Sequence, residues 1–319
     1  MSHFRCYQIW LWVALLMWGW QSPGMTAVRG EKPTPETESP GAGIPLITEP
    51  ALPVLKGKLI IQAQMSLDYL NGRFSRSWKR ESAGGDFTFL TMPVRIDYGI
   101  TKGTSAAVRI PFVNNWASNV DQPVQGQRNA SFGGLGDISL ILKQLLLKET
   151  DNRPVVGAYF EVDFPTGHHR HLNPGRLNTD LLGNGTYEYT VGFDFYKEIK
   201  PFAFYANLWY SMQTTARRDI KGPAVQKINF RDTVTLNLAA GYPLSKKVTF
   251  NLELYSQWDG GRLFGPKANI SPTALMGILP EFAFNLSKQW TMAAGVSLDL
   301  FGKNIGINYT PIVSAIYSY

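Results

Sequence analysis

Polar and apolar residues alternate along most of this chain with a period of two. The C-terminal residues show this clearly, because every second position back from the end is apolar. Successive side chains of a β-strand point to opposite faces, so this alternation predicts a strand with one apolar and one largely polar face. The apolar row is Tyr319, Tyr317, Ala315, Val313, Pro311, Tyr309 and Ile307, and the polar row carries Ser318, Ser314, Thr310 and Asn308.

The same pattern predicts twelve strands, joined by connections that are alternately short and long. Each strand has the roughly 9–11 residues that a tilted strand needs to cross a bilayer. Short turns at one end, long loops at the other and an even number of strands are typical of outer-membrane β-barrels. The expected strands are 57–70, 86–98, 104–114, 134–147, 154–165, 184–197, 201–213, 231–243, 247–259, 273–286, 289–301 and 305–319.

A soluble β-sandwich is the alternative, because its strands also alternate, with the apolar face inside. The aromatic residues favour the membrane, because several lie on the apolar row near strand ends, where an interfacial girdle is expected. These residues are Tyr69, Tyr98, Tyr242, Trp258 and Trp290. We therefore predict an all-β fold, a single antiparallel transmembrane β-barrel of about twelve strands over residues 57–319.

Two segments precede the predicted barrel. Residues 1–24 have the form of a cleaved signal peptide: Arg5 gives a positive start, and residues 9–20 are an apolar run too short to span a bilayer as a helix. An uncleaved anchor is the alternative. Residues 25–56 are rich in Pro, Thr, Glu and Gly, which favours an extended, flexible periplasmic linker over a plug in the barrel.

Composition narrows the class of protein further. The 319 residues are 44% hydrophobic, 13% aromatic and 17% charged, with a net charge of +7. No apolar run outside the predicted signal reaches the roughly 18 residues of a transmembrane helix, which argues against a helical membrane protein. Cys6, within the predicted signal, is the only cysteine, so a disulfide framework and a thiolate metal site are excluded.

The polar rows are expected to face the lumen, and acids outnumber bases on them. The lumen either favours cations, or its acids and bases pair and brace the wall, as we expect for the bases. Acids in excess of such pairs would be solvated, protonated or bound to cations. The acids are Asp68, Asp97, Asp137, Glu161, Asp163, Glu188, Asp194, Glu253, Glu281 and Asp299, and the bases are Arg95, Arg109 and Lys143.

Other polar and aromatic residues extend this picture. Basic residues gather in the long connections, where a basic rim would bind lipopolysaccharide phosphates. Residues 168–171 contain three histidines, but no carboxylate or Cys lies at a fixed offset, so we expect a polar surface loop and no metal site. Five aromatics predicted to face the lumen would either stack with an aromatic solute or pack against one another: Tyr159, Tyr196, Tyr205, Trp209 and Tyr255.

Four short motifs, in order, resemble an outer-membrane family of transporters assigned to the phenol meta-degradation pathway. They are GGLGD at 133–137 before an apolar strand, YGIT at 98–101 with IP at 110–111, FPTG at 164–167, and GNGT at 183–186. The resemblance covers most of residues 57–319 in pattern. It implies a barrel distantly similar to channels for hydrophobic compounds, with aromatic or other hydrophobic small molecules as the substrate class by analogy. It supplies no catalytic residues.

An enzyme is the remaining class to test. Twelve strands is also the size of outer-membrane phospholipase A, and residues 71–80 superficially resemble the segment that carries the active serine of that family. Its serine needs an upstream histidine as base. No histidine occurs between His3 and His168, so Ser77 lacks that partner and we predict no enzymatic activity.

These observations predict a passive outer-membrane channel of a Gram-negative bacterium. Small molecules, with hydrophobic or aromatic compounds as a candidate class, would diffuse through an acid-lined lumen without a cofactor. The alternative is a structural or ligand-binding barrel with a plugged lumen. The expected partners are outer-membrane lipid, lipopolysaccharide, the barrel-assembly machinery through the C-terminal strand, and the solute. No nucleic acid is expected, and the oligomeric state is left open.

Overall fold

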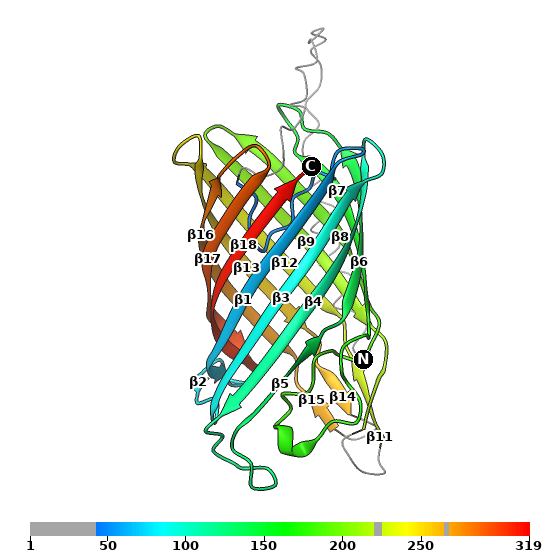
Figure 1. The fold of residues 1–319 in the computed structure, drawn as a ribbon, viewed down its shortest axis with the longest axis vertical. Coiled ribbons are helices and arrows are strands. Elements are labelled where there is room, and N and C mark those ends of the chain that lie inside the picture. Colours follow the sequence, from blue (N-terminus) through cyan, green and yellow to red (C-terminus); the bar gives the residue numbers. More distant parts are fainter. Residues whose placement is uncertain (1–42, 220–224, 265–267) are drawn as a thin grey trace. The chain divides into compact units, whose positions relative to one another are not determined.

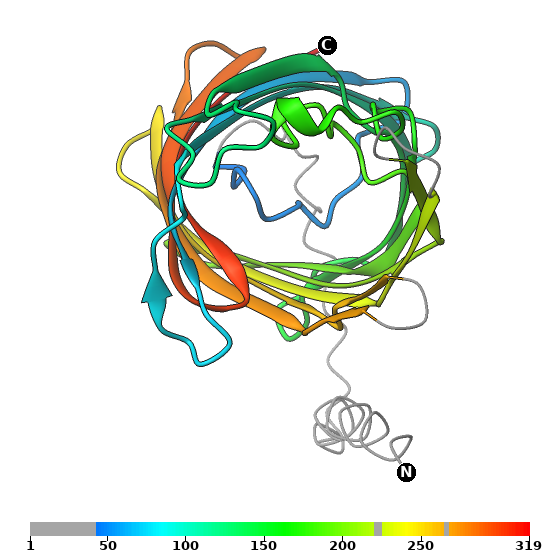
Figure 2. The ribbon, with the colours of Figure 1, turned by 90° about the horizontal axis from the view of Figure 1, so that it is seen from below.

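The computed structural model describes residues 43–219, 225–264 and 268–319. The predicted signal peptide and the linker residues 25–42 lie outside these ranges. The main sheet has fourteen antiparallel strands, of which β2 (Arg80–Glu81) and β5 (Ala130–Leu135) are short. The other twelve follow one another around a ring, and pairing of β1 with β18 closes it into a barrel (Figure 1, Figure 2). The prediction of a single twelve-stranded barrel is confirmed.

Four of the barrel strands are longer than the sequence predicts, and the other eight are shorter by one to four residues. The strands are β1 (Leu59–Phe74), β3 (Asp86–Gly99), β4 (Thr104–Ser118), β6 (Ile138–Leu147), β7 (Val155–Phe164), β8 (Glu188–Ile199), β9 (Phe202–Gln213), β12 (Thr233–Pro243), β13 (Val248–Asp259), β16 (Thr273–Asn285), β17 (Trp290–Lys303) and β18 (Ile305–Ser318). The longer ones are β1, β3, β4 and β17.

The two ends of the barrel differ in their connections. Short turns join β3 to β4, β8 to β9 and β12 to β13 at the end where β18 finishes, which the loop rule identifies as periplasmic. The opposite end carries the long loops, with a 3₁₀ turn at Pro174–Arg176. A small second sheet forms there from β10 (Ala216–Asp219), β11 (Val225–Phe230), β14 (Arg262–Phe264) and β15 (Ala268–Ile270). Among the described residues, no helix is long and apolar enough to cross a membrane.

The prediction that the apolar rows face outward and the polar rows face the lumen is confirmed. Many large apolar side chains that point away from the lumen are about 40% exposed or more, as a lipid-facing wall requires. The girdle aromatics are among them: Tyr69 is 44%, Tyr98 51%, Tyr242 41%, Trp258 42% and Trp290 47% exposed. The alternating inward positions are mostly polar and buried, as on β8 and β9, where Thr190, Asp194, Asn207 and Ser211 lie.

The lumen contains part of the segment that precedes the barrel. Residues 43–58 run inside the ring of strands before β1 begins (Figure 2, blue). Leu46, Thr48 and Ala51 are at most 8% exposed, and wall side chains bind the backbone around them. The expectation of a flexible periplasmic linker is therefore wrong for these residues. We call residues 44–54 the lumen strap.

Candidate functional site

One end of the lumen strap is bound by two carboxylates on neighbouring strands. Glu253 on β13 accepts hydrogen bonds from three consecutive backbone N–H groups, those of Leu46 (2.9 Å), Ile47 (3.0 Å) and Thr48 (2.6 Å). Glu281 on β16 accepts a second bond from the Leu46 N–H at 3.0 Å. Consecutive N–H groups form a concave site that suits a carboxylate. Glu253 and Glu281 are both fully buried, so their role is to fix the strap to this wall.

Apolar packing supports the same contact. The Leu46 side chain belongs to a buried cluster with Leu279, Ala283, Ala293 and Ile312. The two alanines lie on the inner face of β16 and β17, where a small side chain leaves space for Leu46. Burying a leucine in this way stabilises by about 1.5–3 kcal/mol. The strap is thus held here by both polar and apolar contacts.

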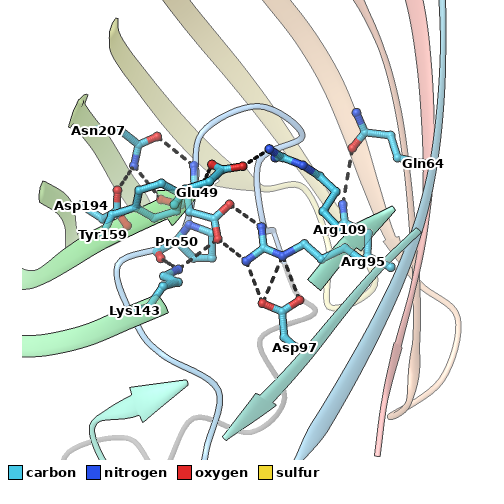
Figure 3. Close-up of polar contacts among 12 residues, drawn as sticks. Glu49, Pro50, Gln64, Arg95, Asp97, Arg109, Lys143, Tyr159, Asp194 and Asn207 are labelled. Atoms are coloured by element: carbon cyan, nitrogen blue, oxygen red, sulfur yellow. Dashed lines mark hydrogen bonds and ion pairs between the residues drawn. The ribbon is translucent and has the colours of Figure 1, made fainter. Parts of the chain in front are cut away.

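The middle of the strap carries Glu49, which meets bases from the opposite side of the barrel (Figure 3). Arg95 on β3 binds it with a fork, Nη1 to Oε2 at 2.8 Å and Nη2 to Oε1 at 2.7 Å. The same guanidinium donates to Asp97 on its own strand. Lys143 on β6 adds a contact to Glu49 Oε1 at 3.1 Å and donates to the Pro50 carbonyl. Four charged groups of zero net charge therefore meet at the strap.

The charge environment fixes the ionisation of Glu49. Burial raises the pKa of its carboxyl, but the positive charges of Arg95 and Lys143, together with their hydrogen bonds, outweigh this effect. The pKa of Glu49 is therefore held well below its ordinary value of 4.5. The carboxylate is ionised at neutral pH, as a fork contact with arginine requires.

An amide on β9 binds the backbone of the same strap residue. Asn207 accepts from the Glu49 N–H at 2.8 Å and donates to the Glu49 carbonyl at 2.8 Å. It also donates to Asp194 on β8, as does the indole of Trp209 at 2.9 Å. Asn207 and Asp194 are completely buried. Because Asn207 alone satisfies both backbone groups of Glu49, the strap crosses the lumen here without strand pairing.

Two wall glycines permit the close approach of the strap. A Cβ at Gly157 would lie 2.5 Å from the Ala51 carbonyl oxygen, and one at Gly99 only 1.9 Å from that of Leu55. Atoms cannot come so close, so both positions need a residue without a side chain. After the strap, the chain passes through Gly57, whose N–H donates to the Gly99 carbonyl, and enters β1.

A cavity of about 370 Å³ lies between the strap and the inner wall. Its polar lining includes Arg95, Lys143 and Arg109, and strap residues such as Ile47 and Leu52 supply apolar surface. Tyr159 and Trp209 form its aromatic wall: their rings stack with centroids 4.7 Å apart at an angle of 16°. An opening that offers both an aromatic face and hydrogen-bonding groups suits a small amphipathic solute.

On the loop side, Arg109 organises a group of acids. Its guanidinium pairs with Glu161, which also accepts from the Tyr159 hydroxyl, and lies 3.8 Å from Asp163. Asp163 accepts from Ser139, and Glu188 accepts from Gln213 at 2.7 Å. A smaller space of about 210 Å³ lies beside this group. These residues form the outer mouth of the lumen.

Asp137 lies between two strands and not, as the sequence predicts, on a barrel strand. The sequence places it on the inner face of a strand, but it falls in the gap between β5 and β6. Its carboxylate accepts from the Gly167 N–H at 2.9 Å and from the Asn184 N–H at 2.8 Å. A Cβ at Gly183 would be 2.3 Å from it. Three of the four family-like motifs therefore meet at this carboxylate, where they tie the loops to the barrel mouth.

Nine of the ten predicted acids lie on barrel strands, and all ten accept a hydrogen bond. Within the part of the chain that the structure describes, only Asp97, Glu161 and Asp163 have a base of the wall as partner. Neutral donors serve most others: Thr310 for Asp68 at 2.6 Å, and Tyr255 for Asp299 at 2.7 Å. Hydroxyl, amide and backbone N–H groups thus supply contacts that the sequence left to solvent, protons or cations.

The predicted bases and aromatics also lie on the lumen side. Arg109 pairs within the wall, whereas Arg95 and Lys143 divide their contacts between the wall and the strap. The aromatics form two separate pairs. Tyr196 packs on Tyr205 with ring centroids 5.1 Å apart, and Tyr159 stacks on Trp209. Sequence reasoning missed Glu49 and Asn207, and it also missed Asn251, which donates to Glu281 at 2.6 Å and to the Gly43 carbonyl at 3.3 Å. The apolar residues between positions 44 and 55, unusual in the preceding linker, were the available signal.

The histidine loop is held by local contacts. His168 Nδ1 lies 2.7 Å from the Asp180 carbonyl and its ring packs near Phe132, while His169 Nδ1 lies 2.8 Å from the Gly167 carbonyl. Within the described ranges, no three histidine, cysteine or acidic residues gather as metal ligands do. Ser77 lies in the exposed hairpin after β1, where its hydroxyl meets that of Ser75 at 3.1 Å.

Comparisons with known proteins identify the architecture and the family. An outer-membrane channel from Pseudomonas putida F1 has a TM-score of 0.72 at 13% identity, over 84% of this chain and 98% of that one. The translocator domain of the autotransporter NalP from Neisseria meningitidis scores 0.48 at 13% identity, covering 82% and 88%. The CymD monoaromatic hydrocarbon channel scores 0.41 at 8% identity, covering 83% and 88%. No curated protein matches.

At these identities the structural likeness concerns the fold alone, and it is the fold of an outer-membrane channel barrel. The sequence match is more specific. A family model described as "Putative MetA-pathway of phenol degradation" matches residues 65–310, which is most of the chain and nearly all of the barrel. The chain is therefore an outer-membrane β-barrel of a Gram-negative bacterium and belongs to this phenol-degradation family.

Proposed function

We propose that this protein is a passive outer-membrane channel for small molecules, with hydrophobic or aromatic compounds as its substrate class. The observation that carries the proposal is the 370 Å³ cavity, which joins the stacked Tyr159 and Trp209 to hydrogen-bonding wall residues inside a closed barrel. A stacking face with polar groups beside it suits an aromatic solute that carries a polar substituent. Membership of the phenol-degradation family supports the same class.

The lumen strap sets the conductance of this channel. It crosses from β13 and β16 to β3 and β6, which lie on opposite sides of the ring. A strap in this position narrows the passage and lines it with mainly apolar side chains and the single charge of Glu49. Transport is then diffusion through the space beside the strap, or through a wider lumen after the strap moves aside. Neither step needs covalent chemistry.

The interactions with the membrane complete the proposal. The outward apolar wall contacts lipid, and β18 is the segment that we expect the barrel-assembly machinery to bind. The hairpin between β1 and β2 carries Arg73, Arg76, Lys79 and Arg80, with Arg80 above the Phe74 ring at 5.7 Å. Only Arg73 has an acidic partner in the described structure, Glu81 at 2.8 Å. The other three charges are available to lipopolysaccharide phosphates.

Planar-bilayer recording of refolded residues 25–319 under a salt gradient tests the proposal. We expect a small conductance with a cation-selective reversal potential from the wild type. Glu253→Ala removes the acceptor of three strap N–H groups and should raise the conductance. Glu198→Ala, at the periplasmic end of β8, removes an equal charge outside the strap contacts and serves as control.

Two results would contradict the channel. A folded wild type and a folded Glu253→Ala variant that both lack conductance would leave the plugged, ligand-binding barrel as the function. Equal rates of swelling of proteoliposomes in aromatic and aliphatic solutes of the same size would remove the aromatic preference. Heat-modifiability on a denaturing gel confirms folding of each variant.

A further inference from the structure

The contact between Glu49 and Arg95 has the geometry of ligand binding. Arginine recognises a planar carboxylate with two parallel hydrogen bonds, and Arg95 does this at 2.7 and 2.8 Å while Lys143 adds a third donor at 3.1 Å. The side chains of Arg95 and Lys143 are only 12% and 5% exposed. Buried donors oriented in this way form a carboxylate site, and a residue of the strap fills it.

The charge balance favours an anion in this site at all times. Asp97 neutralises one base of the pair, and Glu49 neutralises the other. Removal of Glu49 alone would leave one uncompensated positive charge in a buried place, which is costly in free energy. The site would therefore take another carboxylate in exchange. A neutral solute could not replace the lost charge.

Glu49, which fills the site, belongs to a segment that can move away from the wall. Strap residues 44–54 form no strand in the structure and depend on side chains of the wall. The carboxylates that hold Leu46 to Thr48 lie on β13 and β16, away from Arg95, so the Glu49 side chain can leave while that end stays bound. The wall side of the site, by contrast, consists of barrel strands.

The space beside the site fits an aromatic ring. Arg95, Lys143, Tyr159 and Trp209 all line the 370 Å³ cavity. Trp209 is partly exposed, and Tyr159, only 3% exposed, stacks against its indole, so a ring attached to a carboxylate could contact the indole while its charge meets Arg95.

We propose that Arg95 and Lys143 bind the carboxylate of a small aromatic acid, and that Glu49 occupies this site as an internal substitute until such an acid displaces it. The exchange would loosen the strap at its centre and couple solute binding to opening. The proposal rests on the proposed channel only for this last coupling. Binding itself needs the barrel but no flux.

Calorimetric titration of the refolded protein in detergent tests the site, with benzoate as probe. Removing the internal competitor should strengthen binding, so Glu49→Ala is expected to bind benzoate on the order of tenfold more tightly than the wild type, the size of one charge-assisted contact. Glu49→Gln, which keeps the shape of the side chain, should act in the same direction. Arg95→Gln added to Glu49→Ala should abolish the gain.

Matched ligands and a matched variant make the test specific. Benzyl alcohol has the ring without the charge, acetate has the charge without the ring, and both should bind more weakly than benzoate. Glu81→Ala removes a carboxylate at the exposed rim and should bind benzoate as the wild type does. Equal affinity of Glu49→Ala and wild type for benzoate, or equal affinity for benzoate and benzyl alcohol, would overturn the proposal. Equal affinities for acetate and benzoate would overturn the claim that the bound acid is aromatic.

Parallel bilayer recordings separate this inference from the proposed function. Benzoate should raise the wild-type conductance and have little effect on Glu49→Ala, whose site no longer holds the strap. Tight benzoate binding in a protein without conductance would reject the channel and keep the carboxylate site. A conducting protein that shows no benzoate binding in either form would reject the site and keep the channel.

Discussion

At the scale of single residues, Glu49 has the largest effect on the lumen. It lies on a segment that the sequence assigns to a linker, yet it connects Arg95 on β3 and Lys143 on β6. Neither its identity nor its spacing indicates this role, because a glutamate in a Pro-rich stretch usually lies in solvent. Only the path of the strap through the barrel brings the charges together.

The depressed pKa of Glu49 predicts how the strap contact responds to pH. Arg95 and Asp97 on β3, Lys143 on β6, Tyr159 on β7 and Asp194 on β8 surround it. A carboxyl whose pKa is lowered in the folded protein stabilises its contacts fully when the pH is above its ordinary pKa. These contacts are lost as the pH falls through the lowered pKa of the folded state. The difference in conductance between wild type and Glu49→Gln should therefore stay constant from pH 7 to pH 5.

Bilayer recordings across this pH range provide the measurement. Because both proteins share every other titrating group, taking the difference removes the contributions of the remaining lumen acids. The difference should disappear only well below the ordinary value of 4.5. Its loss between pH 7 and pH 5 would mean that Glu49 is not held ionised by Arg95 and Lys143.

At the scale of structural elements, the strap and the strand β7 depend on each other through Gly157. The Ala51 carbonyl occupies the place of a side chain at this position. Gly157→Val should push the strap away while leaving the barrel folded, since the outer face of β7 is unchanged. Ala51, 1% exposed in the structure, would then become accessible.

Cysteine labelling can measure this displacement. The mature chain has no cysteine if the predicted signal is removed at residue 24, so Ala51→Cys provides a single thiol. We expect Gly157→Val to speed its reaction with a maleimide by about tenfold, which corresponds to about 1.4 kcal/mol of easier opening. Gly103→Val, where a Cβ meets only ordinary contacts of 3.5 Å, is the control. Equal rates in both variants would contradict the contact.

The loops at the barrel mouth explain the family-like motifs. In the sequence, GGLGD at 133–137 is one of four short motifs that carry the family resemblance. The structure adds that the Gly167 and Asn184 N–H groups converge on Asp137, and that Gly183 must lack a side chain beside it. These contacts link positions far apart along the chain. Three of the four motifs are therefore structural parts of one loop cluster.

At the scale of the whole molecule, closure of the sheet determines the stability of the protein in lipid. The β1 and β18 ladders pair Ala63 with Ala315 and Met65 with Val313, which removes both free edges. Val313 points outward near the middle of β18 and is 41% exposed. Val313→Arg should lower the free energy of unfolding by about 2–4 kcal/mol, the cost of a charge at mid-bilayer depth.

Chemical unfolding in phospholipid vesicles tests this value. Leu286→Arg in the turn after β16 is the matched control, since an arginine at the interface costs only about 0–1 kcal/mol. If both variants lowered the free energy of unfolding by similar amounts, the bilayer would have to cover a different part of the barrel. A small loss at Val313 alone would indicate that this part of β18 does not face lipid.

The sequence by itself determined the class of fold, the number of strands and the face of almost every barrel residue. It could do so because a period of two is a local property, and because lipid outside and polar groups inside impose the same rule on every strand. Asp137 is the exception, since a break between β5 and β6 leaves it without a strand face.

The tertiary structure decided what fills the lumen and which charges meet there. The strap contacts join residues separated by up to 235 positions, such as Leu46 and Glu281. No local pattern encodes contacts of that range, because they depend on where closure of the barrel places each wall. The sequence could therefore predict that Arg95 and Lys143 face the lumen, whereas only the folded barrel brings Glu49 to them.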